Sequence, residues 1–303
     1  MKIGLVLPVA EYPWKQPSYV EIRDLALRAE DSGFDSVWVY DHLLFREPGL
    51  PTEGIWEAWT VLAALAEATE RVELGTLVLC TAFRNPAVLA KMAVTLDEVS
   101  GGRLILGLGC GWHQPEFDAF GIPFDHRVDR FEEALGIILP LLRTGELDRY
   151  EGRHHWVRGG ELRPRGPRPG GPPVLVAARG PRMLRLAAEH ADLWNGCWFG
   201  PPETAGEALS RLKEASAEVG RAPGTLGVTL GVNVSVGEPG PQDHPVLAGS
   251  PEQVAEGLLA YRDLGVDHLV CNLNPHDRAS QRRLATALRG YHDRLGSTTG
   301  RTG

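Results

Sequence analysis

The stretch VELGTLVLCTAFRNPAVLAKMAVTLDEVSGGRLILGLG, residues 72–109, holds a complete strand–helix–strand unit and decides the fold class. Residues 72–79 and 104–108 are short apolar runs, which predict strands that are buried on both faces. Between them, Asn85 and Pro86 form an N-cap and a first-turn proline, and a Ser-Gly-Gly sequence ends the helix. Two buried strands joined by a helix are typical of a parallel sheet.

The same alternation continues in both directions from this stretch. The further strands expected are 3–8, 36–40, 174–178, 191–195, 226–236 and 268–273. The further helices expected are about 18–32, 56–69, 127–143, 203–219 and 277–294, with one starting at Pro181 and one running from Ser250 to Gly265. Eight strand–helix units in strict alternation predict an α/β fold, a single (β/α)8 TIM barrel. A doubly wound open sheet is the alternative, although no G-x-G-x-x-G motif follows the first strand.

Residues 148–172 interrupt the alternation between the fourth and fifth strands. The segment is rich in Arg, Gly and Pro, and it is too long for a plain connection. We expect an insertion in the barrel, with a small hairpin around YEGRHHWV, residues 150–157. The insertion is either a mobile lid or a solvated surface excursion. The barrel is expected to span residues 1–296, and a flexible tail is expected over 297–303.

The composition is that of an ordinary globular protein. Hydrophobic residues make up 43% of the chain and charged residues 23%. The net charge of -8 argues against broad nucleic-acid binding, which normally requires a basic face. The four cysteines are far apart and fit a reducing compartment better than a disulfide scaffold. No apolar run approaches the roughly 18 residues of a membrane helix, so we expect a cytoplasmic protein without a membrane partner.

Aromatic and polar residues gather where the predicted strands end. In a β/α barrel, the loops after the strands form the active site. Tryptophan and tyrosine side chains there provide walls for a flat ligand. The residues expected to line a substrate pocket are Tyr12, Trp14, Trp112, His113, Trp194 and Trp198.

Asp41 and His42 follow the second strand and are the best candidates for acid–base catalysis. Histidine titrates near neutral pH and can give or take a proton during a redox reaction. The alternative is a pair that only orients the loop. The remaining histidines lack the spacing of metal ligands, so no metal site is expected.

Ala178, Arg179, Gly180 and Pro181 join the fifth strand to its helix. Free N–H groups and the helix dipole make such a position an anion site, and Arg179 adds a guanidinium group. The alternative is an ordinary tight turn. The glycine-rich run 107–111 would similarly let the backbone approach a ligand closely, although a tight turn explains it as well.

Three stretches resemble the luciferase-like monooxygenase superfamily, which includes coenzyme F420-dependent oxidoreductases. They are residues 74–124, 173–195 and 248–270, and the run RNPAVLAK…DEVSGGR…GLGCGW in the first is the most specific. The openings GLVLP and GFDSVWVYDHL also agree. The resemblance covers most of the chain in the right order, except for 148–172 and 199–245.

The resemblance implies a barrel that holds a flavin or deazaflavin ring in its mouth. It implies that Asp41 and His42 lie near the reactive part of the ring. Leu77 and Val78 would form a bulge against the back of the ring, commonly through a non-proline cis peptide. The other cofactor contacts implied are Cys110, Gly111, Ala177, Ala178, Arg179 and Gly180. Relatives often carry glycine or serine at position 179, so the arginine is a departure.

The resemblance also implies an enzyme but leaves its cofactor open. The first hypothesis is an F420-dependent oxidoreductase that transfers a hydride between the deazaflavin and a small organic substrate, while His42 handles the partner proton. The alternative is an FMN-dependent monooxygenase that receives reduced flavin from a partner reductase. A non-catalytic flavin-binding barrel is the second alternative. A homodimer through helices 56–69 and 86–99 is the expected assembly.

Overall fold

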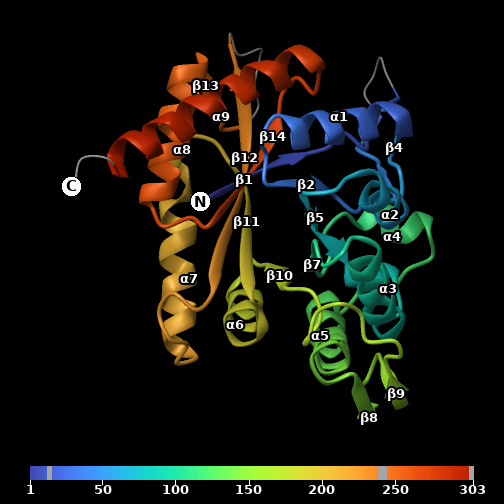
Figure 1. The fold of residues 1–303 in the computed structure, drawn as a ribbon. Coiled ribbons are helices and arrows are strands. Elements are labelled where there is room, and N and C mark those ends of the chain that lie inside the picture. Colours follow the sequence, from blue (N-terminus) through green and yellow to red (C-terminus); the bar gives the residue numbers. More distant parts are fainter. Residues whose placement is uncertain (12–15, 238–243, 300–303) are drawn as a thin grey trace.

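The computed structural model describes residues 1–11, 16–237 and 244–299. Eight parallel strands form a closed barrel, shown in Figure 1. Each strand pairs with two neighbours, because β10 pairs with β7 as well as with β11. In their order around the barrel, the strands are β1 (Lys2–Val6), β2 (Ser36–Val39), β5 (Glu73–Thr76), β7 (Leu104–Gly109), β10 (Val174–Ala177), β11 (Leu193–Phe199), β12 (Gly227–Val236) and β14 (His268–Leu273). The predicted (β/α)8 barrel is confirmed, and the open sheet is excluded.

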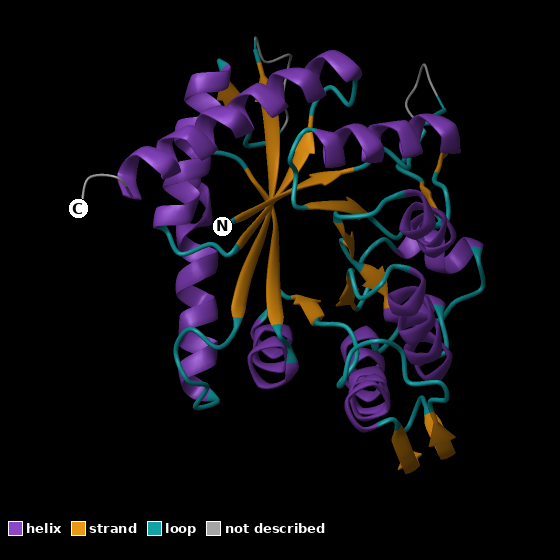
Figure 2. Ribbon diagram, in the orientation of Figure 1, coloured by secondary structure: helices purple, strands orange, loops and turns teal. Residues whose placement is uncertain are grey.

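Helices surround the strands, as Figure 2 shows. They are α1 (Tyr19–Asp31), α2 (Ala58–Ala68), α3 (Pro86–Val99), α5 (Arg127–Thr144), α6 (Pro181–His190), α7 (Gly206–Glu218), α8 (Pro251–Asp263) and α9 (Arg278–Thr299). Helix α9 continues to Thr299, beyond the predicted end near residue 294. The remainder of the predicted tail, residues 300–303, lies outside the described residues.

Local side-chain contacts explain where two of these helices begin. Oδ1 of Asn85 accepts a hydrogen bond from the N–H of Ala87 at 3.0 Å, and Pro86 is the first residue of α3. At α8, the Ser250 hydroxyl and the Gln253 side chain form a reciprocal capping box. Such contacts satisfy N–H groups that a helix leaves without partners. Both predicted helix starts are confirmed.

The inside of the barrel is filled by large apolar side chains at the level below the loops. Trp38 is fully buried there among Val6, Leu77, Ile105, Leu175 and Val270. Gly75, on the next strand, leaves room for the indole, because a Cβ at that position would lie 2.1 Å from the ring. The barrel is therefore a packed core rather than a channel, and ligands are restricted to its end.

The loops hold short elements that the alternation of the sequence does not reveal. They are β3 (Leu44–Phe45), β4 (Glu53–Gly54), β6 (Leu79–Cys80), β13 (Leu247–Gly249), α4 (Gln114–Ala119), and the 3-10 helices η1 (Thr81–Phe83) and η2 (Pro202–Ala205). Two of them concern the functional end of the barrel. Strand β6 resumes after a break in β5, and α4 follows the glycine-rich end of β7.

The insertion forms the predicted hairpin, in which β8 (Glu146–Glu151) pairs antiparallel with β9 (Trp156–Glu161). The carboxylate of Glu133 on α5 accepts hydrogen bonds from backbone N–H groups at the hairpin tip, including that of His155 at 2.8 Å. The hairpin thus packs along the outside of α5, at the edge of the molecule in Figure 1.

After the hairpin, the chain packs against the amino-terminal end of the barrel strands. Arg168 pairs there with Asp97 near the end of α3, with Nε and Oδ2 at 2.9 Å, and it reaches the carbonyl of Leu104 at the start of β7. The loops that follow the strands lie at the opposite end. Of the two alternatives for the insertion, the surface excursion therefore agrees with the structure, and the lid does not.

Two further kinds of feature are absent from the described residues. None of their helices has the length and apolar character needed to cross a bilayer. Within the same residues, no three His, Cys, Asp or Glu side chains gather in a group that could hold a metal ion.

A buried histidine at the base of the barrel predicts a pH-dependent stability. His268 is 3% exposed, and its Nε2 lies 2.7 Å from the Ser36 hydroxyl, which accepts a hydrogen bond from the Trp38 indole. Burial lowers the pKa of His268 to about 3. In the unfolded chain its pKa returns to about 6.5, so the unfolded state binds a proton first as the pH falls. The contribution of the neutral His268 to the free energy of unfolding is therefore complete above about pH 6.5 and is lost as the pH falls toward 3.

Because of this pKa shift, we expect the free energy of unfolding to fall by about 2 kcal/mol when the pH is lowered from 7 to 5. Urea unfolding of the wild type and of His268→Asn at both pH values measures this. The variant is expected to be less stable at pH 7 but to lose less stability on acidification. An equal pH dependence in the two proteins would contradict the assignment.

Candidate active site

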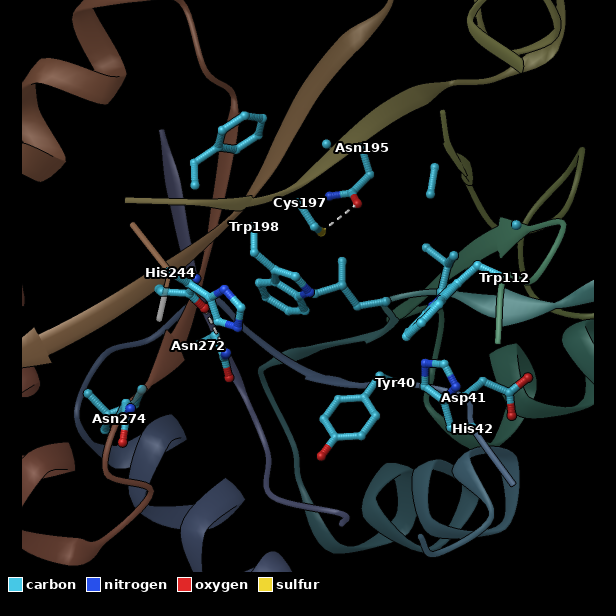
Figure 3. A pocket seen from close by; sticks show the side chains of 18 of the residues that line it. Tyr40, Asp41, His42, Trp112, Asn195, Cys197, Trp198, His244, Asn272 and Asn274 are labelled. Atoms are coloured by element: carbon cyan, nitrogen blue, oxygen red, sulfur yellow. Dashed lines mark hydrogen bonds between the residues drawn. The ribbon is translucent and has the colours of Figure 1, made fainter. Parts of the chain in front are cut away.

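A cavity of about 1960 Å³ opens at the carboxyl ends of the barrel strands. Each of the eight strands, or the loop after it, contributes to the cavity wall. Figure 3 shows His42 and Trp112 on one side of the cavity and Asn272 on the opposite side, with Trp198 and Tyr40 between them. The cavity thus lies at the end of the barrel that the sequence indicated.

His42 and Glu116 form a hydrogen-bonded pair on the cavity wall. Nδ1 of His42 lies 3.0 Å from Oε1 of Glu116, and the other carboxylate oxygen accepts the N–H of Leu43 at 2.8 Å. Glu116 is 1% exposed and comes from α4. Because a carboxylate accepts the hydrogen of Nδ1, Nε2 is the nitrogen available to a ligand. The described residues provide no hydrogen-bond partner for Nε2.

Aromatic rings enclose the imidazole of His42. The ring of Phe45 lies 4.4 Å from it between centroids, and the indole of Trp112 lies 5.5 Å from it in an edge-on arrangement. The ring of Tyr40 approaches it from a third side, with centroids 6.2 Å apart. These contacts hold the imidazole in one orientation beside the cavity, where it can exchange a proton with a bound molecule.

Asp41 has a different role from its neighbour. Its carboxylate is buried and forms two hydrogen bonds with the guanidinium of Arg84, at 2.6 and 3.0 Å, and it accepts the N–H of Cys80 at 2.9 Å. Arg84 also pairs with Glu57, the N-cap residue of α2. Burial raises the pKa of the Asp41 carboxyl, and the contacts with Arg84 act in the opposite direction. Both oxygens of this carboxylate thus accept hydrogen bonds from protein groups, and the residue connects three loops.

Leu77 and Val78 form the break between β5 and β6, and both line the cavity. The peptide bond between them is cis, as the family resemblance implied. The hydroxyl of Thr76 fixes the adjacent strand, because it donates to the carbonyl of Gly107 at 2.8 Å and accepts its N–H at 2.9 Å. A Cβ on Gly107 would lie 1.9 Å from the Thr76 carbonyl oxygen, so only glycine permits this close approach.

The loop from Ala177 to Gly180 lines another side of the cavity. Gly180 is the N-cap residue of α6, and no side chain caps this helix. An uncapped helix N-terminus next to a cavity favours an anion. Arg179 is exposed at the cavity wall, as is Arg211 of α7. Cys110 and Gly111 line the cavity near His42, so the residues predicted for the cofactor all face one space.

The residues predicted for the substrate pocket divide into groups. Trp112 and Trp198 line the cavity with 63% and 39% of their surfaces exposed. Trp194 also lines it but is almost fully buried, and its indole donates to the Ala178 carbonyl at 2.9 Å. His113 is not among the lining residues: its ring is turned into the loop, where Nε2 accepts the N–H of Arg46 at 3.1 Å. Tyr12 and Trp14 lie outside the described residues.

A row of amide side chains crosses the opposite side of the cavity and was not predicted. Nδ2 of Asn272 donates to Oδ1 of Asn233 at 2.9 Å, and Nε2 of His276 lies 3.0 Å from Oδ1 of Asn272. Burial lowers the pKa of His276 to about 4, so this imidazole is neutral at physiological pH and donates through Nε2. Asn195, at the end of β11, lines the same cavity.

A barrel with a histidine–carboxylate pair, an apolar bulge and an open helix N-terminus around one cavity has the construction of an enzyme. Comparison with known proteins gives its class. The chain belongs to the luciferase-like monooxygenase family, whose model matches residues 1–240. Its curated relatives in this comparison are named as reductases, and its structural neighbours include a dehydrogenase and a monooxygenase.

Curated relatives include reductases from archaea and mycobacteria. The chain is 35% identical over 174 residues to 5,10-methylenetetrahydromethanopterin reductase of Archaeoglobus fulgidus, an alignment that covers 57% of this chain and 48% of the relative. It is 33% identical over 224 residues to a phthiodiolone/phenolphthiodiolone dimycocerosates ketoreductase of Mycobacterium tuberculosis, covering 68% and 58%. The aligned part thus spans about half the length of these relatives.

Solved structures support the fold. An F420-dependent secondary alcohol dehydrogenase in complex with an F420–acetone adduct superposes with a TM-score of 0.79 at 19% identity, covering 96% of this chain and 98% of that one. The coenzyme F420-dependent tetrahydromethanopterin reductase of Methanopyrus kandleri gives 0.77 at 21% identity, covering 95% and 97%. A monooxygenase from Streptomyces bottropensis gives 0.75 at 24% identity, covering 96% and 100%.

Proposed function

We propose that this protein is an F420-dependent oxidoreductase that transfers a hydride between the deazaflavin and a small organic substrate. The observation that carries the proposal is the His42–Glu116 pair, which presents a protonatable nitrogen to the same cavity as the Leu77–Val78 bulge. A reaction that moves a hydride to or from a carbonyl or alcohol also needs a proton donor or acceptor.

The residues around the cavity fit a flat cofactor with a phosphate group. Leu77 and Val78 offer an apolar surface for the ring. The backbone at Cys110 and Gly111 lines the cavity next to this surface, because Gly109 lies beside Val78. The loop from Ala177 to Gly180 would hold the phosphate. A Cβ placed on Gly180 would meet no atom within 4 Å, so there is open space beside this loop. Arg179 would add a cationic group there.

The chain's own residues would manage the proton. When bound, the deazaflavin supplies the centre that gives or accepts the hydride. His42 would hold the partner proton on Nε2, and the buried carboxylate of Glu116 would stabilise the imidazolium and fix the tautomer. Asp41 and Arg84 would keep the loop after β2 in place. Phe45 and Trp112 would exclude water from the imidazole.

The names of the relatives favour F420 over FMN. Two structural neighbours are described as F420-dependent, and two curated relatives are named as reductases. An FMN-dependent monooxygenase is the second candidate, because a monooxygenase superposes comparably well. In either case a separate reductase would supply the reduced cofactor, and a homodimer remains the expected assembly. A non-catalytic barrel is disfavoured, because mere binding does not require a histidine paired with a buried carboxylate.

Titration of the purified protein with F420 and with FMN tests this proposal. We expect micromolar binding of F420, observed as a change in its fluorescence and absorbance, and weaker binding of FMN. Tight binding of FMN with none of F420 would replace the first candidate by the second. Failure of both cofactors to bind at micromolar concentration would overturn both enzymatic proposals.

A further inference from the structure

Three arginines line the cavity at a distance from the loop proposed for the phosphate. Arg28 lies on α1, and Arg278 and Arg282 lie about one turn apart on α9. We call these three residues the α1–α9 arginine cluster. Helix α1 follows β1, and α9 follows the adjacent strand β14. Strand β10, which precedes the phosphate loop, lies four strands from β1 in both directions around the barrel. The cluster is therefore on the opposite side of the mouth.

Two guanidinium groups of the cluster lack an acidic partner. Arg28 is half-buried, and its Nε donates to Oε1 of Gln281 at 3.2 Å, which is a neutral acceptor. Gln281 is itself fixed, since its Nε2 donates to the Leu25 carbonyl at 2.9 Å. The guanidinium of Arg282 has no hydrogen-bond or ion-pair partner in the described part of the chain. Only Arg278 approaches a carboxylate, that of Asp24 at 3.8 Å.

The other carboxylates near the cluster are engaged at helix starts. Oε2 of Glu21 accepts the N–H of Ser18 at 3.0 Å in the capping box of α1. Oδ1 of Asp277 accepts the N–H of Ser280 at 2.7 Å at the start of α9. Neither of these two acids forms an ion pair with Arg28 or Arg282 in the described part of the chain.

The charges of the cluster act on one another. Burial, together with the positive charges of Arg278 and Arg282, lowers the pKa of Arg28, against the opposing effect of Asp24. Three like charges that share the single carboxylate of Asp24 repel each other in the free protein. A bound anion would remove this repulsion, and guanidinium groups bind carboxylates and phosphates through paired N–H donors.

We propose that the α1–α9 arginine cluster binds an anionic group of the substrate, a carboxylate or a phosphate. This rests on the proposed function, since it takes the cofactor to occupy the other end of the cavity and the substrate to react beside His42. Gln281 holds Arg28 ready for the anion, which reduces the ordering needed on binding. The substrate class is then an acidic small molecule whose reactive carbon lies away from its charge.

Titration of the apo protein with inorganic phosphate and with succinate, at constant ionic strength, tests the cluster directly. Calorimetry on the wild type and on the double variant Arg28→Gln/Arg282→Gln is the measurement. Loss of two charge-assisted contacts is expected to weaken anion binding by about tenfold or more. The matched control is Arg179→Gln/Arg211→Gln, which removes the same charge from the opposite side of the cavity.

The outcomes separate the two anion sites. The proposal expects the cluster variant to lose the anion site between α1 and α9. The Arg179→Gln/Arg211→Gln variant should keep that site and weaken only the binding of phosphate at the 177–180 loop. Equal affinity in all three proteins, or a loss confined to the control, would overturn it. Phosphate and succinate together show whether the cluster prefers a phosphate or a carboxylate. A loss of F420 binding in the cluster variant would also overturn the proposal, because the anion would then belong to the cofactor.

A second arm uses turnover. With reduced F420, a panel of carboxylic acids that contain a ketone or aldehyde is compared with their methyl esters. The ratio of kcat/KM for acid and ester should fall about tenfold in the cluster variant, mainly through KM. An unchanged ratio would contradict the cluster's role. If the protein does not bind F420 but the cluster variant binds anions more weakly than the wild type, the proposed function is wrong and the proposed anion site is supported.

Discussion

His42→Ala should lower turnover by about two to four orders of magnitude while the affinity for the cofactor changes little. The imidazole is 13% exposed at the cavity wall, and its only hydrogen bond in the described part of the structure is to Glu116. Removing it deletes the group proposed to hold the partner proton but leaves the Leu77–Val78 bulge and the 177–180 loop in place. Steady-state kinetics and cofactor titration on one preparation measure both quantities.

Two companion variants make this prediction specific. Glu116→Gln removes the charge that would stabilise the imidazolium, so turnover should fall less than in His42→Ala and its pH profile should shift. His113→Gln is the matched control, because His113 lies only 6.5 Å from His42 between ring centroids but does not line the cavity. Its turnover should remain close to the wild type. If cofactor affinity collapses in His42→Ala, the residue is an anchor for the cofactor and not the proton carrier.

Arg84→Gln should lower the free energy of unfolding by about 3 to 5 kcal/mol. The change leaves the buried carboxylate of Asp41 without its guanidinium partner. An unpaired charge in a buried position destabilises the folded state, because it has lost its contact with water. It also removes the contact that joins this pair to Glu57 at the start of α2. Urea unfolding at pH 7 measures the loss.

A second substitution distinguishes the loss of charge pairing from a general packing defect. In Asp41→Asn/Arg84→Gln no charge is left buried without a partner, because Glu57 is partly exposed and still caps α2. The double variant should therefore recover part of the stability lost in Arg84→Gln. Arg71→Gln is a suitable control at the opposite end of β5, because Arg71 is exposed and donates to backbone carbonyls. If Arg84→Gln unfolds like the wild type, the ion pair does not hold the loops together.

The regular parts of the fold could be predicted because local sequence determines them. Apolar runs such as 104–108 are buried on both sides, and Asn85 and Ser250 satisfy helix N–H groups within three residues of themselves. The position of the 148–172 insertion depends instead on contacts across the fold. Arg168 pairs with Asp97, which is 71 residues away, and no local pattern indicates such a contact.

The site was predicted unevenly for the same reason. His42 could be predicted because it follows the end of a predicted strand, and the family resemblance indicated the break at Leu77 and Val78. Glu116 was not predicted because it lies in α4, a helix of six residues that is too short to give a periodic sequence pattern. Acidic residues in the loop after the fourth strand were the available signal. Asn233 lies within a ten-residue strand, so its place at the cavity depends on where that strand crosses the rim.

The Asp41–Arg84–Glu57 contacts have a consequence for how this barrel can change over evolution. They tie together the loops after β2 and β6 and the start of α2, so a mutation in any of them disturbs buried charge. On the opposite wall, Asn233 and Asn272 are joined by a hydrogen bond between neutral amides, and exchanging these costs less than breaking a buried ion pair. Substitutions on the amide side of the cavity can therefore change the substrate while the residues around His42 and Asp41 are retained. Laboratory libraries confined to the amide side should yield a higher share of folded, active variants.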